Sequence, residues 1–340
     1  MSLPEGAVTR AELADSPAWY PLEVLPGEAV RLLRLDAAAY RAASFLDQRL
    51  LRTAPPEARV PGAQLSAAGA GLAPCARYLF HTGHVGSTLL SRLIGAREEF
   101  FALREPALLR AAAGPGAALP LPLALGLLGR TWQPGQRAVV KATSFVSEIA
   151  GAILAASGEA VAVLVFAEPL AYLRGILAGD NSRAETRTLA PARLRRLLRR
   201  LEPGTWHSDP RSEGEQVAMS WLSEMLALAA AAREHPAQVL WVEFDAFLRE
   251  PAPALARILR ALGAEPAPGE IEALLAGPLM REYSKAPEHA YDAALRREVL
   301  EAADFNHGAQ IAGGMQWLAA VAAQHAPVRA LLESSARIGA

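Results

Sequence analysis

The stretch FHTGHVGSTLLSRLI, residues 80–94, decides how the rest of this sequence is interpreted. An apolar run ends at its start, Gly83 and Gly86 allow a tight turn, and a helical pattern begins at Ser87. The N-terminus of a helix carries free N–H groups and the positive end of the helix dipole. The hydroxyls of Ser87 and Thr88 add further donors. The stretch therefore predicts an anion site, most naturally for phosphate, between a buried strand and a helix.

A plainer interpretation of the same loop is also open. The nucleotide-binding pattern G-x-x-x-x-G-K-[ST] is not satisfied, because only two residues separate Gly83 from Gly86 and no lysine follows. The loop could then be a simple strand–turn–helix junction in which Ser87 caps the helix.

Five short apolar runs have the continuous hydrophobicity of strands that are buried on both faces. They are RYLFHT from Arg77, FFAL from Phe100, RAVVKAT from Arg137, VAVLVFA from Val161 and QVLWVEF from Gln238. Helical patterns lie at residues 86–96, 213–233 and 251–262. This alternation predicts an α/β fold, a three-layer α/β/α arrangement around a mostly parallel sheet of about five strands.

The two ends of the chain differ from this central pattern. Residues 1–70 are rich in Pro and Ala, with one plausible helix at 35–51, and we expect them to form a lead-in or cap segment. Residues 71–340 would form the α/β domain with a helical C-terminal part. The arginine-rich run 189–204 predicts a basic helix, which either guides an anionic acceptor or presents a solvated face.

The composition excludes several classes of protein. The chain has 340 residues, 52% of them hydrophobic and 20% charged, which is typical of a globular protein. A formal net charge of -1 argues against a general nucleic-acid binder. One cysteine cannot form an internal disulfide, and no Cys/His cluster suggests zinc. The sequence shows neither a signal peptide nor a membrane span, so we expect a cytoplasmic protein.

The segment GHVGSTLLSRLI, residues 83–94, resembles the 5′-phosphosulfate-binding loop of sulfotransferases. The segments that follow it also have the order found in that family: LREP at 103–106, then a strand followed by Glu-Pro, then WVEFDAFLREP at 241–251. The resemblance implies a P-loop-like sulfotransferase fold with helical additions. It implies 3′-phosphoadenylyl sulfate as sulfuryl donor, 3′-phosphoadenosine 5′-phosphate as product, a hydroxyl-bearing small molecule or carbohydrate as acceptor, and no required metal. The phosphosulfate would then bind at Gly83, His84, Val85, Gly86, Ser87, Thr88 and Leu89.

Three segments depart from the family's pattern, and one of them is the family's R-K-G-like C-terminal loop, which is not evident in this sequence. His84 stands where the loop usually has Lys or Arg, and a histidine is a shorter and conditional cation. The 3′-phosphate segment reads AEPLAYLRG, so the family's two arginines and serine are missing at Ala167, Leu170 and Gly175. Arg174 is near enough in sequence to substitute for one of them.

Lysine occurs only twice among the 34 basic residues, at Lys141 and Lys285. Lys141 ends a predicted central strand, at the edge where open α/β sheets bind ligands. Its ammonium group could neutralise the phosphosulfate or the leaving oxygen, or it could extend from the strand end to water. Ser284 and Lys285, in YSKAPEHAY, could hold the 3′-phosphate, or they could lie in an exposed loop.

Glu105 is the favoured catalytic base, because it ends the second strand at the same edge and some bacterial sulfotransferases place a catalytic Glu comparably. A carboxylate is competent as a base where burial raises its pKa, whereas an ion pair with arginines would leave it structural. His84 is the second candidate for the base. Arg104 could bind donor or acceptor, and we expect His81 to make a local hydrogen bond at the strand end.

Two other functions are compatible with the same loop. One is a P-loop-type phosphotransferase that uses an ordinary nucleotide, although the lysine and a clear Mg²⁺-binding Asp are missing. The other is a non-catalytic nucleotide-binding protein that has lost the 3′-phosphate site.

Overall fold

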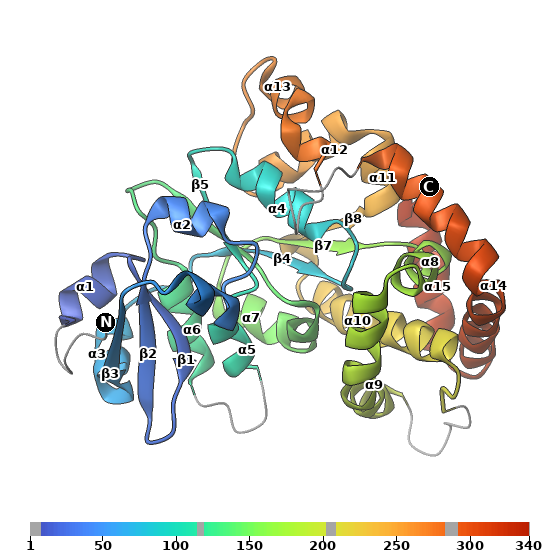
Figure 1. Ribbon diagram of the computed structural model, residues 1–340, viewed down its shortest axis with the longest axis horizontal. Coiled ribbons are helices and arrows are strands. Elements are labelled where there is room, and N and C mark those ends of the chain that lie inside the picture. The colour runs from blue at the N-terminus through green and yellow to red at the C-terminus, as the bar shows by residue number, and fades with distance from the viewer. Residues whose placement is uncertain (1–7, 114–118, 202–208, 283–291, 340) are drawn as a thin grey trace.

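A five-stranded parallel sheet forms the centre of the computed structural model, which describes residues 8–113, 119–201, 209–282 and 292–339 (Figure 1). Across the sheet the strands follow the order β5-β6-β4-β7-β8. Their bounds are Arg77–His81 for β4, Phe100–Arg104 for β5, Arg137–Lys141 for β6, Ala162–Phe166 for β7 and Val239–Glu243 for β8. All five predicted strands and their parallel arrangement are confirmed.

Both faces of this sheet are covered by helices. Side chains of β4 alternate between two apolar cores, with Tyr78 and Phe80 in one and Leu79 in the other. The first core is closed by α5 (Ala107–Ala111), α6 (Leu121–Leu128) and α7 (Ala150–Ala156). The second is closed by α4 (Ser87–Gly95), α8 (Pro169–Leu177), α12 (Pro251–Ala261) and α14 (Ala293–Gln324). The predicted three-layer architecture is therefore confirmed.

The strand order creates a natural place for a ligand. After β4 the chain builds β5 and β6 on one side of it, and then β7 and β8 on the other. In open parallel sheets ligands bind beyond the carboxyl ends of the strands where the order reverses. Here that place lies beside the end of β4, next to His81 and Lys141.

The N-terminal part forms a separate three-stranded antiparallel sheet, at the left of Figure 1. Its strands are β1 (Trp19–Val24), β2 (Ala29–Arg34) and β3 (Glu57–Pro61), with α1 (Arg10–Asp15) and α3 (Gly62–Gly69) beside them. The sequence did not indicate this sheet. The division of the chain near residue 70 stays a prediction.

The predicted helix at 35–51 is wrong. The structure has a short helix α2 (Ala37–Ala42), extended backbone at Ala43 and a 3-10 helix at Gln48–Thr53. The reason is Arg104, whose guanidinium donates to the carbonyl oxygens of Tyr40, Arg41 and Ala43, each at 2.7 Å. These carbonyls end α2, and the contact fixes the N-terminal layer to the end of β5.

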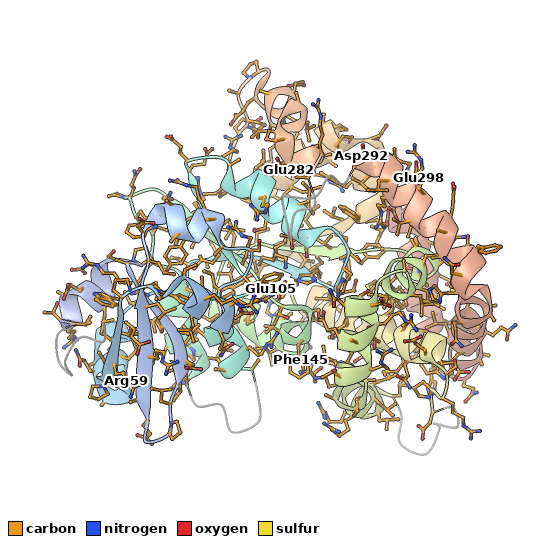
Figure 2. All side chains as sticks on the ribbon, viewed as in Figure 1. Arg59, Glu105, Phe145, Glu282, Asp292 and Glu298 are labelled. Atoms are coloured by element: carbon orange, nitrogen blue, oxygen red, sulfur yellow. The ribbon has the colours of Figure 1, made fainter. Side chains whose placement is uncertain are left out.

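The basic helix is longer than predicted and most of its arginines are paired. It is α9 (Asp180–Arg200), and it packs against α10 (Glu213–Glu234). Arg193 Nε lies 2.9 Å from Glu224 Oε1 on α10, and both side chains are buried. Arg196 donates to the Phe145 carbonyl and lies over that ring (Figure 2). The solvated-face interpretation is therefore wrong for Arg193 and Arg196.

The remaining α-helices lie in the C-terminal part, namely α11 (Phe244–Arg249), α13 (Glu270–Ala276) and α15 (Ala326–Gly339). One 3-10 helix, Ser144–Ile149, follows β6, and two more lie at Pro236–Gln238 and Pro278–Met280. Of the predicted helices, those at 86–96, 213–233 and 251–262 correspond to α4, α10 and α12.

The buried pair between α9 and α10 gives a test of the fold. We expect Glu224→Gln to lower the free energy of unfolding by about 3–5 kcal/mol, because the Arg193 charge then stays buried without a counter-charge. The matched control is Glu213→Gln at the start of α10, whose partly exposed pairs with Arg183 and Arg187 should contribute about 1 kcal/mol or less. Equal losses in urea unfolding would contradict this account.

Candidate functional site

The loop between β4 and α4 has the backbone geometry of a tight, ligand-facing turn. Gly83, His84 and Gly86 all have positive φ, at 94°, 54° and 68°. A Cβ atom at Gly86 would overlap the ring of Phe244, which packs directly against the loop. Two independent reasons therefore favour glycine at position 86: its positive φ, and the lack of room for a Cβ atom beside Phe244.

The helix that follows the loop presents donors where an anion would bind. Gly86 is the N-cap of α4 and supplies no side-chain cap, so the first N–H groups of the helix have no partner within it. Thr88 is buried, and its Oγ1 has no hydrogen-bond partner among the described residues. A buried hydroxyl without a partner is costly, and a bound anion would satisfy it.

A pocket of about 580 Å³ opens at this helix end. Its described lining includes six residues of the predicted phosphosulfate loop: His84, Val85, Gly86, Ser87, Thr88 and Leu89. Gly83 shapes the turn without lining the pocket. Further lining residues come from α11, the segment 279–282 and the first turns of α14, where Glu282 and Asp292 are labelled in Figure 2.

Three titratable groups meet at the carboxyl edge of the sheet, near the centre of Figure 2. Lys141, at the end of β6, has no exposed surface and donates from Nζ to Glu105 Oε1. The same carboxylate oxygen lies 4.0 Å from His81 Nε2. Lys141 and His81 both line the pocket. The structure therefore joins the predicted cation and the predicted base in one cluster beside the phosphate loop.

The position of Glu105 is set by the backbone. Its φ is 50°, and its N–H donates to the Lys141 carbonyl at 2.7 Å, so the turn after β5 directs the side chain to the neighbouring strand. The alternative of an ion pair with arginines is wrong in its partner, because Glu105 pairs with Lys141. Lys141 does not extend to water.

Arg104 takes no part in the pocket. Its guanidinium is bound to the carbonyls that end α2, and burial lowers the pKa of Arg104 to about 10. The hypothesis that it binds donor or acceptor is therefore wrong in this structure.

His84 lies at the top of the loop and faces α9. Its Nε2 is 3.1 Å from Glu185 Oε2, and its side chain is partly exposed. This contact occupies Nε2 with a carboxylate of α9, and His84 lines the pocket at the turn of the loop. Its roles as loop cation and as base both stay predictions.

Of the residues expected at the 3′-phosphate site, Arg174 is not brought to the pocket. Arg174 points to α14, where it forms a two-pronged ion pair with Asp304 at 2.7 and 2.6 Å. Gly175 lines the pocket, but the atom nearest to its missing Cβ is Leu300 Cδ2. Ser284 and Lys285 lie outside the described residues.

Sequence analysis missed the arginines that do line the pocket, namely Arg281, Arg296 and Arg297. Arg296 is buried, binds Asp245 at 2.8 and 3.2 Å, and lies 5.1 Å from the Phe244 ring centroid. The sequence offers little indication of these arginines, because the residues between Arg281 and Arg296 show no strand or helix periodicity and the chain contains many other arginines.

Two carboxyl groups lie at the ends of β7 and β8. Glu243 accepts hydrogen bonds from the N–H groups of Asp245 and Ala246, so it caps α11. Burial raises the pKa of Glu243 despite these bonds. Burial and the charge of Glu243 raise the pKa of Glu168, whose Oε1 has no partner among the described residues.

Comparison with known proteins returns sulfotransferases among the solved structures. The sulfotransferase domain from the curacin biosynthetic pathway is 12% identical over 64% of this chain and 83% of that domain, with a TM-score of 0.39. The sulfotransferase domain from the Synechococcus PCC 7002 olefin synthase is 14% identical over 67% and 93%, with a TM-score of 0.37. Retinol dehydratase in complex with androsterone and inactive cofactor PAP is 12% identical over 89% and 93%, with a TM-score of 0.31.

No protein-family model and no curated protein matches the chain. Within the described ranges, no helix has the length and apolar character needed to cross a membrane. The same residues hold no group of three His, Cys, Asp or Glu side chains able to bind a metal ion. A cytoplasmic location stays a prediction.

The geometry at Gly86 can be tested against a matched glycine. Gly86 and Gly158 have similar positive φ, but nothing lies within 4 Å of the missing Cβ of Gly158. We expect Gly158→Ala to cost about 1–2 kcal/mol from backbone strain alone. Gly86→Ala should cost about 1–3 kcal/mol more, because the methyl group overlaps Phe244. Chemical unfolding measures the loss of stability in both variants. Equal losses in Gly86→Ala and Gly158→Ala would show that Phe244 places no steric limit on residue 86.

Glu168 predicts a pH dependence of stability. Its pKa in the folded state is raised above the ordinary value of 4.5, so the fold favours the protonated form and loses stability as the pH rises through the folded-state pKa. We expect Glu168→Gln to raise the melting temperature at pH 7.5 and to change it little at pH 4. Exposed Glu159→Gln is the control. A lower melting temperature of Glu168→Gln at pH 7.5 would contradict a raised pKa of Glu168 in the folded state.

Proposed function

We propose that this protein is a sulfotransferase that moves a sulfuryl group from 3′-phosphoadenylyl sulfate to a hydroxyl of a small molecule or carbohydrate. One observation carries the proposal: the loop at 84–89 and the buried cation Lys141 face the same pocket at the carboxyl edge of a parallel sheet. An anion-binding helix end beside a fixed cation suits a phosphosulfate group.

The reaction needs few covalent tasks from the protein. The acceptor oxygen forms a bond to sulfur, the bond from sulfur to the bridging phosphate oxygen breaks, and the bisphosphate leaves with the electron pair. The proton of the acceptor hydroxyl passes to a base. Positioning and charge stabilisation supply most of the rate in the closely related phosphoryl transfers, and we expect the same here.

Named residues would divide these tasks. The N–H groups of Ser87, Thr88 and Leu89 would bind the 5′-phosphate oxygens, and Thr88 Oγ1 would add a hydroxyl donor. Lys141 and His84 would stabilise charge on the sulfuryl oxygens and on the leaving phosphate. Glu105 would take the proton of the acceptor hydroxyl, and the protonated carboxyl group would still accept the hydrogen bond from Lys141.

The second phosphate of the donor requires a site other than the family's usual one. Ala167, Leu170 and Gly175 offer no cation, and Arg174 is bound to Asp304. We propose that Arg281 and Arg297, which line the pocket, supply the charge for the 3′-phosphate. Ser284 and Lys285 stay predictions from the sequence.

A thermal-shift series tests the donor. We expect 3′-phosphoadenosine 5′-phosphate to raise the melting temperature, since a ligand at 100 times its Kd stabilises the fold by about 2.7 kcal/mol. AMP should act more weakly, because it lacks the 3′-phosphate. A response to ATP only in the presence of Mg²⁺ would indicate a phosphotransferase, and no response to any nucleotide would contradict an enzyme of either kind.

Two charge-removing variants locate the donor beside Lys141. Lys141→Met leaves Glu105 partly buried without its cation and should itself destabilise the fold. The double variant Lys141→Met/Glu105→Gln removes both charges and should restore stability. We expect both variants to bind the bisphosphate at least tenfold more weakly than the wild type. Wild-type affinity in a correctly folded double variant would exclude Lys141 from the site.

A further inference from the structure

His81 links the phosphate loop to the catalytic cluster by a hydrogen bond that fixes its protonation. It ends β4, and its side chain is 5% exposed. Its Nδ1 accepts the N–H of Gly83 at 3.0 Å. A ring nitrogen that accepts a hydrogen bond carries no proton, so the imidazole is neutral and its proton is on Nε2.

This tautomer decides what His81 can do. Nε2 already carries a proton, and the Nδ1 lone pair is used by Gly83, so His81 is not a base in this arrangement. It is a donor, and its Nε2 lies 4.0 Å from Glu105 Oε1, the oxygen that also binds Lys141. A hydrogen bond needs about 3 Å between these atoms. Catalytic hydrogen bonds are often long without substrate and shorten when it binds.

The loop and the ring meet at Gly83. The N–H of Gly83 donates to His81 Nδ1 at 3.0 Å, and Gly83 has a φ of 94°. The next residue, His84, faces Glu185 on α9 and lines the pocket. Occupancy of the loop can therefore reach the His81 ring through the Gly83 peptide.

We propose that His81 is a positioning residue that couples occupancy of the phosphate loop to the orientation of Glu105. The proposal rests on the proposed sulfotransferase function. With the donor bound, His81 Nε2–H and Lys141 both hold Oε1, which leaves Oε2 of Glu105 for the acceptor proton. His81 gains and loses no proton in the step, and Glu105 becomes neutral when it takes the proton.

Two substitutions separate the two nitrogens of the ring. His81→Asn keeps a side-chain oxygen near the place of Nδ1 and removes the donor at Nε2. His81→Gln places an amide nitrogen near Nε2 and gives up the acceptor for Gly83. The probes are binding of 3′-phosphoadenosine 5′-phosphate by calorimetry, and turnover of 3′-phosphoadenylyl sulfate with water as the acceptor, at saturating donor.

We expect opposite patterns from the two variants. His81→Asn should bind the bisphosphate within about threefold of the wild type while its turnover falls about tenfold to a hundredfold, the size of one hydrogen bond to a charged group. His81→Gln should bind at least tenfold more weakly and keep more of the saturated turnover. Equal losses of binding and turnover in both variants, or wild-type turnover in His81→Asn, would overturn the proposal. A wild-type protein that binds but shows neither transfer nor turnover would instead contradict the proposed function.

Discussion

The rest of the site depends on one constraint, the burial of the Lys141 ammonium at the end of a central strand. A charge without exposed surface has to be paired, and Glu105 is in reach because β5 and β6 are neighbours with Arg104 opposite Lys141. Replacing such a pair by apolar residues often costs a fold nothing. The pair lies beside the loop at 84–89, and the proposed function gives it a chemical role there.

The second element is the loop itself, which is held in a conformation that most residues avoid. His84 takes a positive φ without being glycine, and Phe244 leaves no room beside Gly86. Backbone strain of this kind costs on the order of 1–3 kcal/mol and clusters at ligand sites. The strain, the buried Thr88 hydroxyl and the His81 hydrogen bond point to the same place.

The sequence predicts the sheet and part of the site for identifiable reasons. Strands buried on both faces are continuous apolar runs, so all five were visible, and residues at the ends of adjacent parallel strands meet by geometry, which brought Glu105 and Lys141 together. The N-terminal sheet was missed because its first strand contains Pro21 and an irregular register. Arg174 and Arg104 were misplaced because their partners, Asp304 and the carbonyls near residue 40, are far away in sequence. Long-range pairs of this kind leave no local pattern.

The central claim is that the backbone amides at the start of α4 hold the donor's phosphosulfate. The most direct test is a titration of isotope-labelled protein with 3′-phosphoadenosine 5′-phosphate, followed by the amide resonances of residues 83–89. We expect saturable shifts that are largest for Ser87, Thr88 and Leu89 and that AMP reproduces at these amides, because both ligands carry the 5′-phosphate. Saturable shifts elsewhere with these amides unchanged, or no shifts at all, would contradict the account.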